Sequence, residues 1–261
     1  MSKVPILTYH SIDSSGSVIS TSPEKFASQM RYLAESSFKV ISLNDVVKCI
    51  QERRPFPPKA AVITFDDGFK NIYDEAYPVL RKFGFKATVF LVPGYCGRNN
   101  RWNGQPEGIP TLDLLSWDEI GEMVHNGVEF GAHTMSHPDL SRCSLAQATQ
   151  EIAHSKSMIQ RHIGRDVLFF AYPYGKLTGD IKRVVKDQFY GSCSTKLGFT
   201  TLESDIYSLP RIDMYYFSKN NLFLWLETPF SPIYVNFRKI LRLIKLGLLQ
   251  SEWVILNLKY L

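Results

Sequence analysis

The chain has 261 residues, of which 44% are hydrophobic and 21% are charged, a composition that is ordinary for a soluble globular protein. Its formal net charge is +5, and four of the positive charges fall in residues 230–250, which contain no acid. Since residues 1–229 are nearly neutral, we do not expect the body of the protein to bind nucleic acid or another polyanion. The length fits one large α/β domain, or one domain with an appendage.

The cysteines and the N-terminus indicate the compartment. No two cysteines form a CxxC pair, so the sequence does not support a zinc ribbon or a redox motif; they are Cys49, Cys96, Cys143 and Cys193. The N-terminal apolar run covers only Val4–Leu7 and lacks a small-residue cleavage site, which predicts a first strand and no signal peptide. We therefore expect a cytoplasmic protein whose thiols stay reduced.

In chain order, short apolar runs alternate with segments of helical periodicity. The predicted strands are Val4–Tyr9, Phe38–Leu43, Ala61–Phe65, Ala87–Val92, Val128–Ala132, Val167–Tyr172, Phe189–Ser194 and Ile206–Ile212. Helices are predicted from Pro23 onward, over Asp45–Gln51 with Asn44 as its cap, over about Tyr73–Phe83, from Ser116 to Asn126, over Leu145–Ile163 and over about Gly179–Asp187. This alternation predicts a parallel sheet closed into a barrel.

Polar residues follow several of these strands. In a parallel barrel the chemistry lies at the carboxyl ends of the strands, and six candidate residues fall there: His10, Asp66, Asp67, His133, His137 and Tyr174. A loop over Pro93–Pro110, rich in Gly, Asn and Pro, carries Trp102, which we interpret as a candidate for stacking on a ring of the substrate. These residues together predict one active face.

Asp66 and Asp67 end a core strand, and Gly68 then lets the backbone turn away. Two adjacent like charges in such a place need compensation, usually by a metal ion or a shared proton. A pair of solvated turn aspartates is the simpler alternative. His133 and His137 favour the metal, because two histidines four residues apart can share one face of a helical turn and reach one ion together with a carboxylate. The other aspartate then remains free as a base, which predicts a metal-dependent hydrolase.

These segments resemble the motifs of the polysaccharide deacetylases, carbohydrate esterase family four with the nodulation-protein deacetylase homology domain. The resemblance rests on Thr64-Phe-Asp-Asp-Gly68, His133-Thr-Met-Ser-His137 and Phe170-Ala-Tyr-Pro-Tyr-Gly175. The opening Leu7-Thr-Tyr-His10 resembles the permuted branch that contains biofilm poly-N-acetylglucosamine deacetylases, in which an N-terminal histidine replaces the late catalytic one. The resemblance covers roughly residues 4–213 and implies a distorted, incomplete (β/α)7-type barrel of mostly parallel strands.

The resemblance also implies a role for each matching residue. Asp67, His133 and His137 are expected to hold one divalent metal ion, with zinc favoured and cobalt, nickel or iron accepted by the same ligands. Asp66 is expected to be the general base and His10 the general acid. The backbone N–H of Tyr174 is expected to complete an oxyanion hole, which predicts a mild effect for Tyr174→Phe.

The third motif departs from the common family pattern at one position. Ala171 stands where many members have an arginine that orients the base. Arg211 resembles a position that recurs in the permuted branch, and is our candidate for supplying that charge; a surface ion-pair partner is the alternative. No histidine follows His162, which fits the permuted branch and gives His10 more weight.

The C-terminal segment has a different character. Apolar residues fall at helical spacing with basic residues between them; the apolar ones are Ile233, Phe237, Ile240, Leu241, Ile244 and Leu248, and the basic ones are Arg238, Lys239, Arg242 and Lys245. We divide the chain into a catalytic domain, residues 1–217, and a basic amphipathic extension, residues 218–261. The charges interrupt the run too often for a membrane span. Two interpretations remain: a helix packed across the barrel, or peripheral contact of residues 230–250 with an anionic membrane on its inner face.

The sequence thus predicts an enzyme that removes N-acetyl groups from an N-acetylated glycan, polymeric or lipid-linked, and releases acetate. One alternative keeps the fold and the metal but cleaves O-acetyl esters or small amides. A second is a non-catalytic module that binds glycans or membranes, against which the intact base and metal ligands argue. The sequence gives no indication of the oligomeric state.

Overall fold

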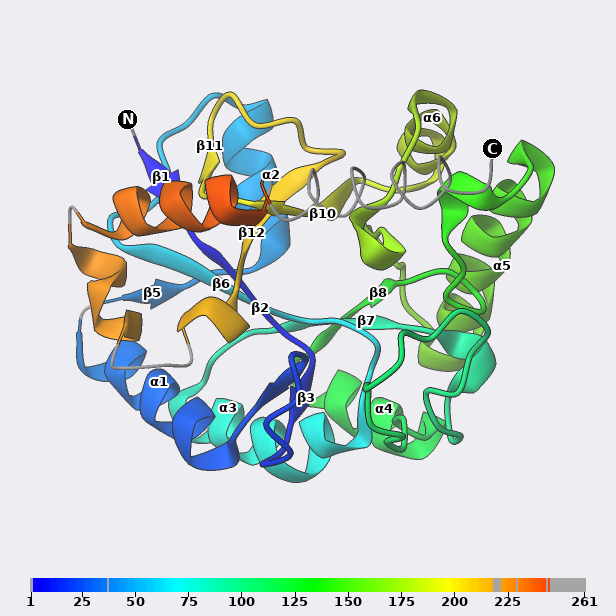
Figure 1. Cartoon of the computed structure of the whole chain (residues 1–261), viewed down its shortest axis with the longest axis horizontal. Coiled ribbons are helices and arrows are strands. Elements are labelled where there is room, and N and C mark those ends of the chain that lie inside the picture. The colour runs from blue at the N-terminus through cyan, green and yellow to red at the C-terminus, as the bar shows by residue number, and fades with distance from the viewer. Residues whose placement is uncertain (1, 37, 218–221, 229, 243, 245–261) are drawn as a thin grey trace, which may run out of the picture.

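Seven parallel strands close into a ring within the part of the chain that the computed structural model describes, residues 2–36, 38–217, 222–228, 230–242 and 244 (Figure 1). The strands are β2 (Ile6–Tyr9), β6 (Ala60–Phe65), β7 (Thr88–Leu91), β8 (Glu129–Ala132), β9 (Phe169–Ala171), β10 (Gly191–Leu197) and β12 (Leu209–Asp213). Their order is β2-β12-β10-β9-β8-β7-β6, and pairing of β2 with β6 closes the ring. The predicted barrel of mostly parallel strands is confirmed.

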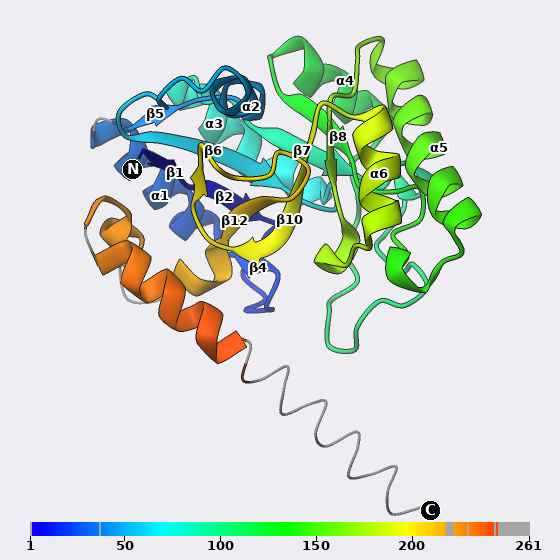
Figure 2. The same ribbon diagram turned by 90° about the horizontal axis from the view of Figure 1, so that it is seen from above.

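Helices cover the outside of this ring (Figures 1 and 2). They are α1 (Pro23–Glu35), α2 (Leu43–Gln51), α3 (Tyr77–Phe83), α4 (Trp117–His125), α5 (Leu145–Ile163) and α6 (Gly179–Gln188). Short strands lie at the periphery: β5 (Lys39–Val40) beside β6, β1 (Lys3–Val4) with β11 (Thr200–Thr201), and β3 (Ser11–Ile12) with β4 (Ser20–Thr21). A last helix, residues 230–242, lies outside the ring near β12.

The strands of the ring are buried on both faces. Every residue of β2, β6, β7 and β9 is buried, which is why these strands appear in the sequence as continuous apolar runs without alternation. The polar residues that follow them therefore come together at one end of the ring.

Two local predictions were wrong. The second predicted strand is only Lys39–Val40, because Ser42 begins the next helix: its hydroxyl accepts from Asp45 N–H, and the Asp45 carboxylate accepts from Ser42 N–H. Asn44 therefore lies inside α2 and does not cap it. The predicted helix over 73–83 begins as a π-type turn, Ile72–Ala76, since Pro78 has no N–H to continue an α-helical pattern there.

The predicted C-terminal helix is present over residues 230–242; residues 243 and 245–250 of that prediction lie outside the described residues. Its buried side chains are Ser231 and Val235, and the Tyr234 hydroxyl donates to the Tyr216 carbonyl oxygen over 2.8 Å. The predicted apolar stripe of this helix faces outward: Ile233, Phe237, Ile240 and Leu241 are all exposed. Among the described residues, no helix combines the length and the apolar character that crossing a bilayer requires.

Candidate active site

The turn after β6 sends the two aspartates to different partners. Asp66 still follows the strand, with its N–H donating to the Tyr9 carbonyl oxygen over 3.0 Å. Asp67 and Gly68 then adopt φ of 70° and 73°, which reverses the chain. A Cβ on Gly68 would lie 2.7 Å from Leu91 Cδ2, so the turn also needs glycine for space. As a result the Asp66 and Asp67 carboxylates lie side by side in sequence but have separate environments.

Asp67, His133 and His137 form a buried cluster with the arrangement of a metal site. The Nε2 atoms of His133 and His137 lie 3.5 Å and 3.3 Å from Asp67 Oδ1, and the three ligand atoms all lie within 4.8 Å of one another. His133 Nδ1 contacts the Ala171 carbonyl oxygen at 2.7 Å, and His137 Nδ1 contacts the Tyr174 hydroxyl at 3.1 Å. These partners favour a proton on Nδ1, which leaves the Nε2 lone pairs directed at Asp67 and fits a divalent ion.

The ionisation of this cluster suits a cation. Burial and the neighbouring His137 lower the pKa of His133 to about 4, so its imidazole is neutral near neutral pH. Burial alone would raise the pKa of Asp67, but the hydrogen bond and charge of His137 lower it below its ordinary value. The Asp67 carboxylate and the neutral imidazole of His133 are therefore available as ligands, and His137 directs its Nε2 at the same carboxylate.

The two histidines do not share a helical turn, which is where the spacing argument was wrong. Residues 133–137 form a loop after β8, in which Thr134 and His137 have positive φ, 65° and 61°. The Thr134 hydroxyl accepts from the His137 N–H over 3.0 Å and holds the loop closed. Of the six non-glycine residues with positive φ in the described chain, four belong to the site: Asp67, Thr134, His137 and Tyr174. Such strain is typical of functional loops.

Asp66 is paired with Arg211. The guanidinium donates from Nη1 to Oδ1 over 2.8 Å and from Nη2 to Oδ2 over 2.6 Å, and both side chains are buried. Nε of Arg211 donates to the Ser194 carbonyl oxygen over 3.0 Å, which fixes the fork. Burial would raise the pKa of Asp66, but Arg211 overrides this and holds it well below its usual range. Asp66 is therefore ionised and fixed in orientation, and the interpretation of Arg211 as a surface ion-pair partner is wrong.

His10 follows β2 and faces the same carboxylate. Its Nε2 lies 3.9 Å from Asp66 Oδ2, and its side chain is 26% exposed. The residues after it are held by Asn71, which accepts from Ile12 N–H at 2.9 Å and donates to the Ser11 hydroxyl at 2.7 Å. His10 thus stands between the buried Asp66 and solvent, where a group that exchanges protons with a substrate must lie.

Tyr174 contributes through both its backbone and its side chain. It has φ of 57°, and its N–H donates to no acceptor in the described part of the chain. Its hydroxyl contacts His137 Nδ1 and donates to the Gly104 carbonyl oxygen over 3.3 Å. Gly175 follows because a Cβ there would lie 1.8 Å from Thr195 Oγ1. The expected backbone donor is free, and the hydroxyl adds a positioning contact that the sequence did not predict.

This contact changes the expectation for Tyr174→Phe. The variant keeps the backbone N–H but removes the acceptor for His137 Nδ1–H, so we expect metal affinity to fall about tenfold, the lower end for loss of a ligand's hydrogen-bond partner. Turnover at saturating metal should change little. Metal titration followed by assay at saturating metal separates the two, and an unchanged metal affinity would show that the hydroxyl does not support His137.

Trp102 is not a solvent-facing sugar platform. Its side chain is 4% exposed, and its ring centroid lies 4.4 Å from that of His137. The loop that carries it therefore covers one metal-ligand candidate. The sequence could not distinguish this from a sugar platform, since both place an aromatic side chain in a polar loop.

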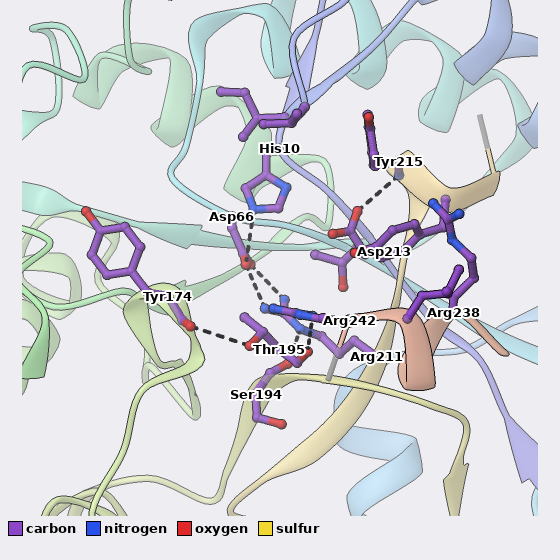
Figure 3. A pocket seen from close by; sticks show the side chains of 15 residues that line it. His10, Asp66, Tyr174, Ser194, Thr195, Arg211, Asp213, Tyr215, Arg238 and Arg242 are labelled. Carbon is purple, nitrogen blue, oxygen red and sulfur yellow. Dashed lines mark hydrogen bonds and ion pairs between the residues drawn. The ribbon is translucent and has the colours of Figure 1, made fainter. Parts of the chain in front are cut away.

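Two adjoining cavities open onto these groups. One, of about 310 Å³, is lined by the three metal-ligand candidates and by Trp102. The other, of about 610 Å³, extends toward Asp213 and the helix of residues 230–242 (Figure 3). Both are lined by His10, Asp66, Tyr174 and Thr195, so the cavities meet at the predicted acid and base.

Sequence reasoning missed several residues of the site. Ser194 contributes only its carbonyl oxygen to Arg211, which no sequence pattern reveals. Thr64 Oγ1 accepts from Arg211 Nη1 at 3.4 Å, and its place in the first motif was the one available signal. Arg238 and Arg242 were predicted to lie on a helix that either packs across the barrel or contacts a membrane, and neither was predicted to reach the site, yet both line the larger cavity.

Comparisons with known proteins identify the family and support the fold. A sequence model of one family, described as polysaccharide deacetylase, matches residues 53–190. The poly-beta-1,6-N-acetyl-D-glucosamine N-deacetylase of Staphylococcus epidermidis is 30% identical over 203 residues, which cover 74% of this chain and 67% of that relative. The deacetylase PplD of Streptococcus pyogenes, solved with acetate, superposes with a TM-score of 0.71 at 25% identity over 81% of this chain and 92% of its own. IcaB of Ammonifex degensii has a TM-score of 0.72 at 23% identity over 86% and 97%, and supports the fold.

Proposed function

The chain belongs to the polysaccharide deacetylase family, and on this premise we propose that it removes N-acetyl groups from an N-acetylated glycan and releases acetate. The observation that carries the proposal is the arrangement at the meeting point of the two cavities. A buried Asp-His-His cluster lies beside a second aspartate held by arginine, and a partly exposed histidine, His10, faces that aspartate. This arrangement supplies a cation site, a base and an acid within one cleft, as amide hydrolysis requires.

The chain's own groups have distinct roles in this reaction. A divalent ion held by Asp67, His133 and His137 would activate a water molecule and polarise the acetyl carbonyl. Asp66 accepts a proton from the attacking water, because Arg211 occupies one lone pair on each oxygen and leaves others free. The Tyr174 N–H donates to the carbonyl oxygen as it gains charge. His10 gives its proton to the amide nitrogen when the C–N bond breaks, so that acetate and a free amine leave.

The metal and the domain boundaries complete the proposal. We propose zinc as the native ion, since one carboxylate and two imidazoles form a common zinc set, and cobalt, nickel or iron as functional substitutes. We also propose residues 1–217 as the catalytic domain and 218–261 as an extension. The seven strands of the ring and all the predicted metal, acid and base residues fall within residues 1–217, which supports this division.

We propose peripheral contact with an anionic membrane through the last helix, on the inner face if the protein is cytoplasmic. Residues 230–242 contain three basic residues and no acid, and an exposed apolar stripe runs along the helix: Phe230, Ile233, Phe237, Ile240, Leu241 and Ile244. The exposed Trp225 extends it, with its ring centroid 6.4 Å from that of Phe230. Phe237→Glu should sharply lower co-sedimentation with phosphatidylglycerol vesicles. Co-sedimentation of the variant equal to that of the wild type would contradict this contact, and so would equal binding of the wild type to zwitterionic vesicles.

The test of the activity is acetate release from N-acetylglucosamine oligomers by chelator-treated protein before and after metal is restored. We expect no release before and release after, because without the cation the carbonyl is not polarised. An O-acetylated substrate of the same size serves as the comparison. Release from the ester alone would assign the site to an O-acetyl esterase, and failure to take up metal would remove the basis of the proposal.

A further inference from the structure

We infer that Arg238 and Arg242 form a binding site for a phosphoryl group carried by the glycan substrate. The inference rests on the proposed function, because it extends the same cleft to a second recognition site. It concerns helix residues 230–242, which lie outside the segment matched by the family model.

The two arginines line the cavity that adjoins the active site. The cavity of about 610 Å³ is lined by His10, Asp66 and Tyr174 and also by Arg238, Leu241 and Arg242. In Figure 3, Arg238 lies across the cavity from Tyr174. A ligand that places an acetamido group near Asp66 would therefore extend its remaining parts toward this helix.

Both guanidinium groups are held in place without an acidic partner. Arg242 Nη1 donates to the Thr195 carbonyl oxygen over 2.9 Å, and the Arg238 guanidinium carbon lies 4.5 Å from the Tyr216 ring centroid. Within the described residues, no carboxylate forms an ion pair with either arginine. Arg211 provides the contrast, since Asp66 occupies both of its terminal nitrogens. The remaining donors of Arg238 and Arg242 are thus available to a ligand.

The charge of the cavity favours an anion. Asp66 and Arg211 neutralise each other, and the other acid that lines the cavity, Asp213, accepts from the Tyr215 N–H over 3.0 Å. Two arginines against one aspartate leave a positive charge in a half-buried wall. A neutral sugar would leave these cations partly desolvated without compensation, whereas the planar guanidinium fork matches the oxygens of a phosphoryl group.

The rim of the same cavity suggests what carries the phosphoryl group. Val18 and Leu241 line the cavity and are 58% and 40% exposed, and Leu241 belongs to the apolar stripe of the helix. We therefore infer a substrate in which the phosphoryl group joins a glycan to an apolar carrier. Its glycan would lie in the cleft, its phosphoryl group on the two arginines and its carrier along the apolar stripe.

The experiment compares kcat/KM for an N-acetylglucosamine oligomer with and without a phosphate at its reducing end. For the wild type we expect the phosphate to raise kcat/KM about tenfold or more, as for charge-assisted hydrogen bonds to arginine. Arg238→Gln and Arg242→Gln should lose this gain. Lys239→Gln is the matched control, because Lys239 is exposed on the same helix, carries the same charge and does not line the cavity. Calorimetric titration with the phosphorylated oligomer should show the same order of affinities without turnover.

Three results would overturn the inference. If the wild type deacetylates both oligomers equally well, the phosphoryl site is absent but the proposed function stands. If Lys239→Gln loses the gain as fully as the arginine variants, the gain comes from the overall positive charge of the helix and not from a binding site. If phosphatidylglycerol vesicles raise activity in an Arg238- and Arg242-dependent manner while the phosphorylated oligomer has no effect, the anion is a lipid headgroup.

If no substrate is turned over, the proposed function fails, and the titration still decides on the phosphoryl site. Arg242→Lys, which keeps the charge, replaces Arg242→Gln if the latter does not fold.

Discussion

Asp66→Asn should lower the kcat of acetate release by about 10³-fold, within the range for loss of a general base, while metal still binds one-to-one. The amide has nearly the same volume as the carboxylate but cannot take a proton from the attacking water. It does not touch the metal cluster, whose carboxylate comes from Asp67. The measurement pairs a metal titration with single-turnover acetate release. The Asn side chain can still accept one hydrogen bond from Arg211, so the folded protein should persist at assay temperature.

His137→Ala is the contrasting variant. It removes one ligand candidate together with the Tyr174 contact, so we expect both metal binding and turnover to be lost. If Asp66→Asn lost the metal and Asp67→Asn kept it, the roles assigned to the two aspartates would be reversed.

Arg211→Met should be the most destabilising single change at the site, by about 3–5 kcal/mol at neutral pH, because it leaves the Asp66 carboxylate buried without its partner. In the wild type the folded-state pKa of Asp66 is depressed. The group therefore contributes stability above its unfolded pKa, near 4, and loses it as pH falls through the folded pKa. Without Arg211, burial raises the folded pKa above the unfolded one, and the sign of the contribution is inverted.

The loss in free energy of unfolding caused by Arg211→Met should therefore be largest at neutral pH and shrink in acid, as Asp66 becomes protonated in the variant. Denaturant unfolding at pH 7 and at pH 4 measures this difference. The acid limb of the pH–rate profile should also move to higher pH, since the base is protonated earlier. Arg211→Lys keeps the charge but not the two-pronged contact, so its stability should fall between those of the wild type and Arg211→Met. A deficit that is the same at both pH values would mean that the arginine acts by packing alone.

The pairing of Asp66 with Arg211 also explains the departure at Ala171. Ala171 lies on β9, where its carbonyl oxygen contacts His133 Nδ1, while the arginine that holds the base comes from β12. The two positions are separated in sequence but open onto the same end of the ring. The charge that orients the base can thus come from either strand, because all the parallel strands of a closed barrel present their carboxyl ends to one site.

The sequence by itself determined most of the strands and helices and the position of the polar groups that follow the strands. Buried parallel strands are continuous apolar runs, and their ends are marked by residues that cannot stay in the core, such as Asp66 and His133. Since such ends meet at one edge, the sequence also predicted that Asp67, His133 and His137 would come together. Local patterns were sufficient for these elements, because the spacing of apolar residues along a short segment marks which residues its fold will bury.

The tertiary structure alone decided which side chains touch. Arg211 and Asp66 lie 145 residues apart, and only closure of the ring brings them into contact. The same holds for the contact of the Tyr174 hydroxyl with His137 and for the packing of the Trp102 ring against that of His137. Helical periodicity identified an amphipathic helix over residues 230–242 but not the face that meets the barrel. Packing directs Val235 inward, places Arg238 and Arg242 in the cleft and leaves the apolar stripe exposed, because shape and hydrogen bonding between distant segments are not encoded in any local pattern.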